Sequence, residues 1–195
     1  MELTVTRAWL LPAFLLSTTA FAQDAPNLVP SRDVTATYRV SGAAASRIPG
    51  GAPDGVRVAW NASGQRLRAE VVGQPNYALV SLRARVLDIV FSLQRAYFEL
   101  PIRGGDPQSL LAGTDVRFTR RGPGRVAGLA CTEWAVKSRK LDGVGCVTDD
   151  GVVLQAQGTF NGEPGEAVAT SVSYGNAGPS LSPPPDFFRL AAPSR

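Results

Sequence analysis

The side chains best suited to chemistry in this chain are its two cysteines, Cys131 and Cys146, which lie fifteen positions apart. A pair of thiols can form a disulfide, bind a metal ion or act in redox catalysis. Redox centres of the thioredoxin type use a C-x-x-C motif, which this sequence lacks. The choice between the remaining chemistries depends on the compartment in which the protein folds.

The N-terminus has the three-part layout of a secretory signal peptide. Arg7 precedes an apolar run from Ala8 to Leu16, and a small-x-small site, Ala20-Phe21-Ala22, follows. We predict a signal peptide over residues 1–22, cleaved after Ala22. The alternative is a membrane anchor, but the run is shorter than the roughly 20 residues of a span and contains Pro12. The expected mature protein is soluble, has no transmembrane segment, and is periplasmic or secreted.

Export favours a disulfide between Cys131 and Cys146, because exported proteins fold in an oxidising compartment. Closing a loop of this length stabilises a fold by about 3 kcal/mol on the chain-entropy estimate. Two free, buried thiols are the alternative. The pair is therefore expected to be structural.

The sequence contains no histidine, and this absence limits catalysis. Ser-His-Asp and Cys-His sites and the usual transition-metal sites all need histidine. Asp149 and Asp150 are adjacent carboxylates that a turn could bring together over a cation, but Asp-Asp-Gly is more typical of a plain turn. We therefore expect a protein that is not an enzyme and has no cofactor or catalytic metal.

Positive charge in this chain comes almost entirely from arginine, since Lys137 and Lys140 are the only lysines and the net charge is +4. A basic exported protein can contact anionic head groups or envelope glycans, whereas nucleic acid is a poor candidate. The arginines that could form such a contact surface are Arg66, Arg68, Arg83 and Arg85. The alternative for these four residues is an ordinary solvated face.

Alternating apolar and polar residues predict a chain built mainly of short strands. After a flexible lead over residues 23–32, residues 33–195 are expected to form one β-rich domain. Predicted strands are Val34–Val40, Val56–Trp60, Arg66–Val71, Tyr77–Leu82, Val86–Phe91, Arg95–Leu100, Asp115–Arg121, Cys131–Arg139, Gly145–Thr148, Val152–Gln157 and Ala167–Tyr174. Leu87–Leu100 could alternatively be helical, although its β-branched and aromatic residues favour strands.

The segment Asp106–Ala112 carries the clearest helix signal, with Asp106 as N-cap and Pro107 at the first helical position. Gly122–Gly124 is predicted to be a turn, and Phe187 and Phe188 are expected to dock on the core. The predicted fold class is mainly β: a single curved antiparallel sheet, half-barrel or barrel-like, of about ten strands, with one short helix and one disulfide.

Four aromatic residues are candidates for lining an apolar ligand pocket in the concave face of this sheet. They are Trp60, Tyr97, Phe98 and Trp134. The alternative is that all four belong to the ordinary core of the domain.

The chain from Tyr38 to Leu190 resembles a family of exported bacterial proteins of unknown function. The segments that carry the resemblance are Arg66–Glu70, Tyr97–Pro101, Val126–Cys131 with Trp134, Cys146–Val152 and Pro184–Phe187. In strand order such proteins are distantly similar to periplasmic lipoprotein carriers of the LolA/LolB kind, in which a curved antiparallel sheet wraps an apolar cavity. This resemblance implies a curved sheet and an apolar ligand, and it implies no catalytic residues.

Two functions follow from these observations. The first is a non-enzymatic, monomeric periplasmic protein that binds a lipid, lipopeptide or other apolar ligand in the concave face of the sheet. The alternative is a cell-envelope module that contacts a partner protein and has no small-molecule ligand. A co-purifying lipid would separate the two.

Overall fold

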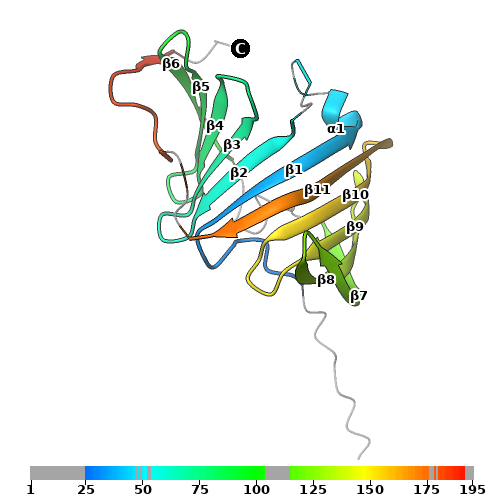
Figure 1. The fold of residues 1–195 in the computed structure, drawn as a ribbon. Helices are drawn as coiled ribbons and strands as arrows, with labels where there is room; N and C mark the ends of the chain where they lie inside the picture. Colours follow the sequence, from blue (N-terminus) through cyan, green and yellow to red (C-terminus); the bar gives the residue numbers. More distant parts are fainter. Residues whose placement is uncertain are drawn as a thin grey trace, which may run out of the picture.

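A computed structural model describes residues 25–46, 48, 50–51, 54–103, 115–175, 178 and 180–191 (Figure 1). The predicted signal peptide and the predicted helix Asp106–Ala112 lie outside these residues. The elements in chain order are β1 (Val34–Gly42), α1 (Ala43–Ser46), β2 (Val56–Asn61), β3 (Arg66–Val71), β4 (Tyr77–Ser81), β5 (Val86–Phe91), β6 (Ala96–Pro101), β7 (Arg117–Val126), β8 (Leu129–Lys137), β9 (Leu141–Val147), β10 (Val153–Phe160), β11 (Glu163–Tyr174) and β12 (Phe188–Leu190).

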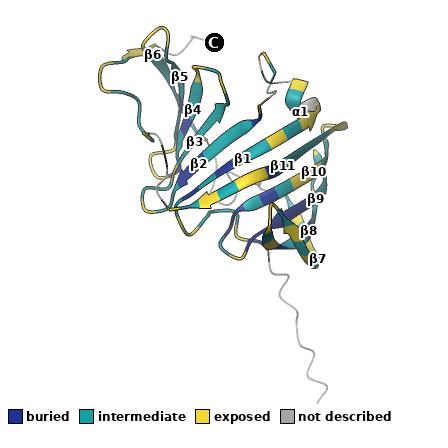
Figure 2. Ribbon diagram, in the orientation of Figure 1, coloured by how far each residue is buried: buried dark blue, intermediate teal, exposed yellow. Residues whose placement is uncertain are grey.

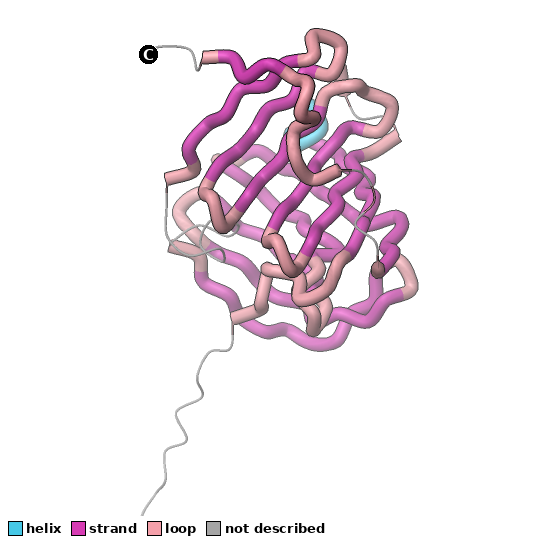
Figure 3. Tube along the Cα trace, turned by 90° about the vertical axis from the view of Figure 1, so that its left-hand side faces the viewer, coloured by secondary structure: helices cyan, strands magenta, loops and turns pink. Residues whose placement is uncertain are grey.

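All twelve strands belong to one sheet with the order β12-β6-β5-β4-β3-β2-β1-β11-β10-β9-β8-β7. Every neighbouring pair is antiparallel except β12 and β6, which are parallel, so the sheet is mixed. The strands at the two ends of this order do not pair with each other, so the sheet stays open. Strands dominate the described chain, as Figure 3 shows, which confirms the predicted mainly β, curved sheet.

Strands β2 to β6 form a meander held by three turns of the same design. Each turn ends in a non-glycine residue with left-handed backbone: Gln65, Arg85 or Arg95. The carbonyl oxygen of that residue accepts a backbone hydrogen bond from Leu82 after β4, from Ile102 after β6 and from Phe188 at the start of β12, respectively. The first two bonds lie along one margin of the sheet, and the bond from Phe188 to Arg95 ties β12 to the opposite margin.

The centre of the sheet is a pairing between the beginning and the end of the domain. β1 pairs with β11 over the full length Val34–Gly42, with one irregularity between Thr37 and Tyr38. This pairing joins the β2–β6 meander to the second meander, β7 to β11 (Figure 1). The two halves of the sheet share one core through it.

A row of four glycines crosses the sheet from β9 to β1. Gly143, Gly158, Gly165 and Gly42 are direct partners on β9, β10, β11 and β1. A Cβ atom on Gly143 would lie 2.3 Å from the carbonyl oxygen of Gln157, and one on Gly42 would lie 2.6 Å from that of Pro164. Only glycine permits such an approach of neighbouring backbones, which is the usual mark of a sheet bend.

Buried side chains from both meanders meet in one core. Val34 and Trp60 come from the first half, and Cys131, Leu154 and Ala169 come from the second. In Figure 2 the buried segments lie along strands from both halves, whereas β12 and parts of several turns are exposed. The core is thus assembled across the β1–β11 pairing.

Three sequence expectations about local structure are corrected. Gly122–Gly124 lies inside β7 and is not a turn, because the edge position tolerates Pro123 and a register shift between Arg120 and Gly122 absorbs the irregularity. The hairpin turn is instead Ala127-Gly128, where both residues have left-handed backbone.

The other two corrections concern the C-terminal phenylalanines and the segment Ser41–Gly55, whose Gly, Ala, Pro and Ser residues predict a loop. The helical turn α1 lies inside that loop. Phe188 does not dock on the core: it is 72% exposed, at the start of edge strand β12. The ion pairs Arg95–Asp186 and Arg189–Glu99 hold this terminal segment beside β6 instead.

We predict that Gly143→Ala lowers the free energy of unfolding by about 2–3 kcal/mol, because the new methyl group would collide with backbone atoms of β10. Gly145→Ala is the matched control on the same strand and face, since its Cβ atom would meet nothing closer than 3.5 Å. Denaturant unfolding of both variants measures the difference. Equal losses of stability would show that close backbone approach does not govern the bend.

Candidate binding groove

An apolar groove of about 500 Å³ lies over strands β8 to β11. Its side-chain walls include Leu28, Val116, Phe118, Trp134, Val136 and Val153. Much of the remaining lining is glycine and alanine from β9, β10 and β11. Binding sites for apolar molecules are usually concave, largely apolar and of this general size. The groove is therefore the candidate functional site among the described residues.

Strand register explains why a hollow forms at this place. Directly opposed residues on antiparallel strands point to the same face of the sheet. One such row across β8 to β11 is Trp134, Gly145, Ala156 and Ala167, and the next row is Val136, Gly143, Gly158 and Gly165. Large side chains on β8 thus stand beside a floor made of the smallest residues.

Strand β7 supplies the outer wall of the groove. Phe118 is the direct partner of Val136, so both side chains lie on the groove face. Arg120 is the partner of Trp134 and lines a smaller adjoining hollow of about 190 Å³ together with Trp134 and Thr132. The apolar surface of the groove therefore ends at a basic residue on the edge strand.

The N-terminal lead crosses one end of the groove and is fastened there by Asp150. The Asp150 carboxylate accepts hydrogen bonds from Arg32 at 2.7 Å, from the Tyr174 hydroxyl at 3.3 Å and from the Thr148 hydroxyl. Its backbone oxygen accepts the amide of Ser31. Leu28, four residues before Arg32, is thereby held at the groove wall.

Asp150 is consequently an ionised anchor. Burial of the carboxylate opposes ionisation, but hydrogen bonds from Thr148 and Arg32 outweigh this effect, so the pKa of Asp150 lies below its usual range. Arg32 also stacks 4.1 Å from the centre of the Tyr174 ring. The sequence predicted a plain turn at Asp149–Gly151, but it did not predict the contacts of Asp150 with Arg32 and Tyr174.

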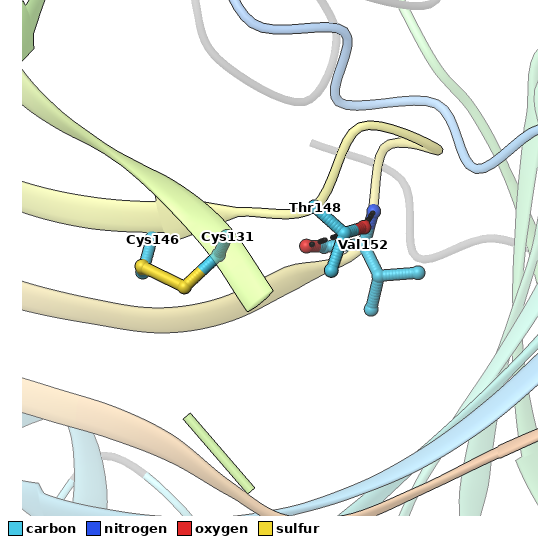
Figure 4. The surroundings of a disulfide bond; sticks show 4 residues. All are labelled: Cys131, Cys146, Thr148 and Val152. Carbon is cyan, nitrogen blue, oxygen red and sulfur yellow. Dashed lines mark hydrogen bonds between the residues drawn. A yellow bond between two sulfur atoms is a disulfide. The ribbon is translucent and has the colours of Figure 1, made fainter. Parts of the chain in front are cut away.

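Cys131 and Cys146 form the predicted disulfide and link β8 to β9 (Figure 4). Both cysteines lie on the opposite face of these strands from Trp134, since each is an odd number of residues from a groove-facing position. Gly124 leaves room for the bridge, because a Cβ atom there would lie 2.7 Å from the Cys146 sulfur. The disulfide therefore supports the groove wall from behind.

The four aromatic candidates lie in different places. Both tryptophans are buried: Trp134 is 6% exposed and lines the groove, whereas Trp60 is 2% exposed and donates its indole N–H to the carbonyl of Pro30. Tyr97 and Phe98 are neighbours on β6 and point to opposite faces of the sheet. The structure does not bring these four side chains into one site.

The four candidate arginines also lie in two different places. Arg66 and Arg68 contact the C-terminal segment at Ser182 and Ser180, and Arg68 stacks on the Tyr77 ring. Arg83 and Arg85 are exposed at the turn between β4 and β5. Much of the surface of the first pair is thus already engaged within the chain.

One buried carboxyl group lies away from the groove. Asp88 is 8% exposed, and its Oδ1 atom has no hydrogen-bond partner among the described residues. Burial raises the pKa of Asp88, Glu99 on the opposing strand raises it further, and Arg189 partly offsets both effects. Within the described ranges, no three His, Cys, Asp or Glu side chains gather in a way that could hold a metal ion.

Sequence reasoning identified Trp134 but missed the groove floor. The available signal was small residues at alternate positions in three successive strands: Gly143 and Gly145, Ala156 and Gly158, and Gly165 and Ala167. The partnership of Arg32 with Asp150 spans 118 positions and left no local signal. None of the described helices is long and apolar enough to cross a membrane.

Solved structures with the same fold are found at low sequence identity. An uncharacterized conserved protein from Thermus thermophilus matches with a TM-score of 0.51 and 13% identity, over 82% of this chain and 90% of that chain. MucB matches with a TM-score of 0.50 and 16% identity, over 84% of this chain and 62% of that chain. The Pseudomonas aeruginosa MucA/MucB complex matches with a TM-score of 0.48 and 17% identity, over 85% and 60%.

These likenesses establish the fold alone. This chain spans less than two thirds of the MucB chain. No protein-family model and no curated protein matches the sequence. The similarity to LolA/LolB carriers stays a prediction. What the chain shares with its structural neighbours is thus one curved sheet.

We predict that Asp150→Asn lowers the free energy of unfolding by about 1–3 kcal/mol at pH 7, because the clamp loses its charge. A carboxylate whose folded pKa is depressed stabilises the fold above its unfolded pKa of about 3.9, and this contribution is lost as pH falls through the folded value. The gap between wild type and variant should therefore narrow below about pH 4. Urea unfolding across this pH range measures it.

The exposed neighbour Asp149 supplies the control, since Asp149→Asn changes the same formal charge one residue away. This control should unfold like wild type at every pH. A constant gap for Asp150→Asn down to pH 2 would contradict an ionic clamp.

Proposed function

We propose that this protein is a non-enzymatic binding protein of the bacterial cell envelope that holds an apolar segment of a partner protein in the groove over β8 to β11. The observation that carries the proposal is the floor of glycine and alanine beside Trp134 and Phe118. No side chain larger than a methyl group stands on this floor in two adjacent rows, so an incoming apolar group can pack close to the backbone. Export, inferred from the N-terminal sequence, supports a periplasmic location.

A protein segment is the first candidate for two reasons. The groove adjoins the edge strand β7, whose outer backbone groups are available to an extended chain in the part that the structure describes. In addition, MucB, which has this fold at a TM-score of 0.50, has been solved in complex with MucA. For this chain, the groove and the edge strand are the main support for a protein partner, and the MucB complex is a comparison.

A lipid or lipopeptide chain is the second candidate, and the apolar lining favours it. Trp134, Phe118 and Val136 offer almost no hydrogen-bonding groups to a ligand. An acyl chain would fit such a surface as well as an apolar side chain would. The two candidates share one site and differ in the molecule that co-purifies with the protein.

Catalysis has little support in this site. The chain contains no histidine, and both cysteines are consumed by the disulfide. Glu163 and Glu166 line the groove, but Glu166 accepts a hydrogen bond from Gln155. We therefore propose binding without chemistry and without a cofactor.

The test fills the groove from its floor with Gly145→Val. A Cβ atom at this position meets only Gln155 O at 3.5 Å and Val136 Cγ2 at 3.9 Å, so the added side chain occupies the hollow without a backbone clash. Peptides selected from a displayed random library against wild type should lose at least tenfold in affinity for Gly145→Val. Isothermal titration with the synthesised peptides measures the change.

Ala130→Val is the matched control, because Ala130 is exposed on the same strand as Trp134 but does not line the groove. The control variant should bind like wild type. The proposal of a protein segment in the groove would be overturned if no peptide is selected, or if the peptides bind Gly145→Val and Ala130→Val with equal affinity. Native mass spectrometry of the protein from its own envelope tests the second candidate: a bound lipid that Gly145→Val loses would favour a lipid ligand.

A further inference from the structure

The edge strand β7 has one strand neighbour. It pairs with β8 from Arg117 to Val126, and no strand of the described chain lies on its other side. An edge of this kind presents unpaired N–H and C=O groups that can pair with another extended chain. The regular part of β7 runs from Arg117 to Arg120, before the register shift.

Arginines dominate this edge and have no acidic partner among the described residues. Arg117, Arg120 and Arg121 are exposed, and none of them forms an ion pair with any described residue. The basic residues of the neighbouring strand ends differ, since Arg139 pairs with Asp115 and Lys137 pairs with Asp142. Among these basic residues, the ones without an ion pair to a described residue therefore lie on β7.

The same edge continues into the groove. Val116 and Phe118 line the groove, whereas Arg117, which lies between them, points to the other face. A strand added beside β7 would thus meet apolar Val116 and Phe118 on the groove face and Arg117 on the other face, until Arg120 ends the apolar stretch on the groove face. A partner segment that fits needs apolar residues at every second position and acidic residues between them.

Like charges disfavour a second copy of this chain as the occupant. Two β7 edges placed side by side would bring two sets of arginines together, and opposed like charges destabilise a strand pair. Pro123 and the irregularity at Arg120/Gly122 also blunt the second half of the edge. Among the described residues, no strand covers the first half of β7, which leaves it open to a chain of opposite charge.

We propose that β7 adds an extended, acidic segment of a partner protein as a further strand, with carboxylates on Arg117 and Arg121 and apolar side chains beside Phe118 in the groove. Carboxylates pair with guanidinium groups through charge-assisted hydrogen bonds, which give the edge its selectivity. Main-chain hydrogen bonds supply affinity in this binding mode, and the alternating side chains supply specificity. This inference rests on the proposed function and specifies its partner class.

The probe is a short synthetic peptide in which Glu alternates with Val, compared with the same peptide carrying Gln in place of Glu. Wild type should bind the Glu peptide at least tenfold more tightly than the Gln peptide at low salt, and added salt should shrink this ratio. The double variant Arg117→Glu/Arg121→Glu should abolish or invert the preference. Fluorescence anisotropy with labelled peptides measures all three.

Arg83→Glu/Arg85→Glu is the matched control. It makes the same change of net charge at the exposed turn between β4 and β5, which lie far from β7 in the order of the sheet. This control should keep the preference for the Glu peptide. Hydrogen exchange gives a second readout: the bound Glu peptide should slow exchange of β7 backbone amides, which a purely ionic contact would leave unchanged.

Four outcomes would overturn the inference. They are equal binding of the Glu and Gln peptides, loss of the preference in the control variant, binding without protection of β7, and no binding of either peptide. If peptides selected for the groove still depend on Gly145, the proposed function survives each of these results. Binding of phosphatidylglycerol vesicles through Arg117 and Arg121, with no binding of the Glu peptide, would assign the edge to an anionic lipid surface instead.

Discussion

Contact between neighbouring backbones at the glycine row sets the shape of this molecule. In the row Gly143, Gly158, Gly165 and Gly42, a Cβ atom on Gly143, Gly158 or Gly42 would collide with the backbone of the neighbouring strand. Because the collision partners are carbonyl oxygens and Cα atoms, no rotamer change could relieve them. The glycines that permit this close approach also leave no side-chain atoms to fill the groove above them.

Two cross-links hold the groove over β8 to β11 in its shape. Behind it, the disulfide joins β8 to β9 on the face away from Trp134. At one end of the groove, the Asp150 carboxylate accepts hydrogen bonds from Arg32, Thr148 and Tyr174, and the bond from Arg32 holds the N-terminal lead against the sheet. A surface fixed from two sides loses little conformational freedom when a ligand arrives, and such preorganisation favours binding.

Local patterns in the sequence predicted most of the strands but little of the site. Alternation of apolar residues located β1 to β6 closely, because each strand is short and bounded by a recognisable turn. It failed at Gly122–Gly124, since glycine and proline signal a turn equally well when they occupy a bulged edge strand. Trp60 and Trp134 looked alike in sequence, and only strand register separates a core residue from a groove residue. Register and the Arg32–Asp150 pair are long-range properties that no local window contains.

The pairing of β1 with β11 also has a consequence for the order of assembly. Each meander consists of contacts between residues close in sequence, which form quickly, whereas Val34 must find Tyr174 across most of the domain. Until that search succeeds, the core that both halves share is incomplete and its apolar side chains stay open to water. The slow step of folding should therefore be the closure of the central seam, and a chain delivered across a membrane in an extended state would complete this closure only after residues 163–174 have emerged.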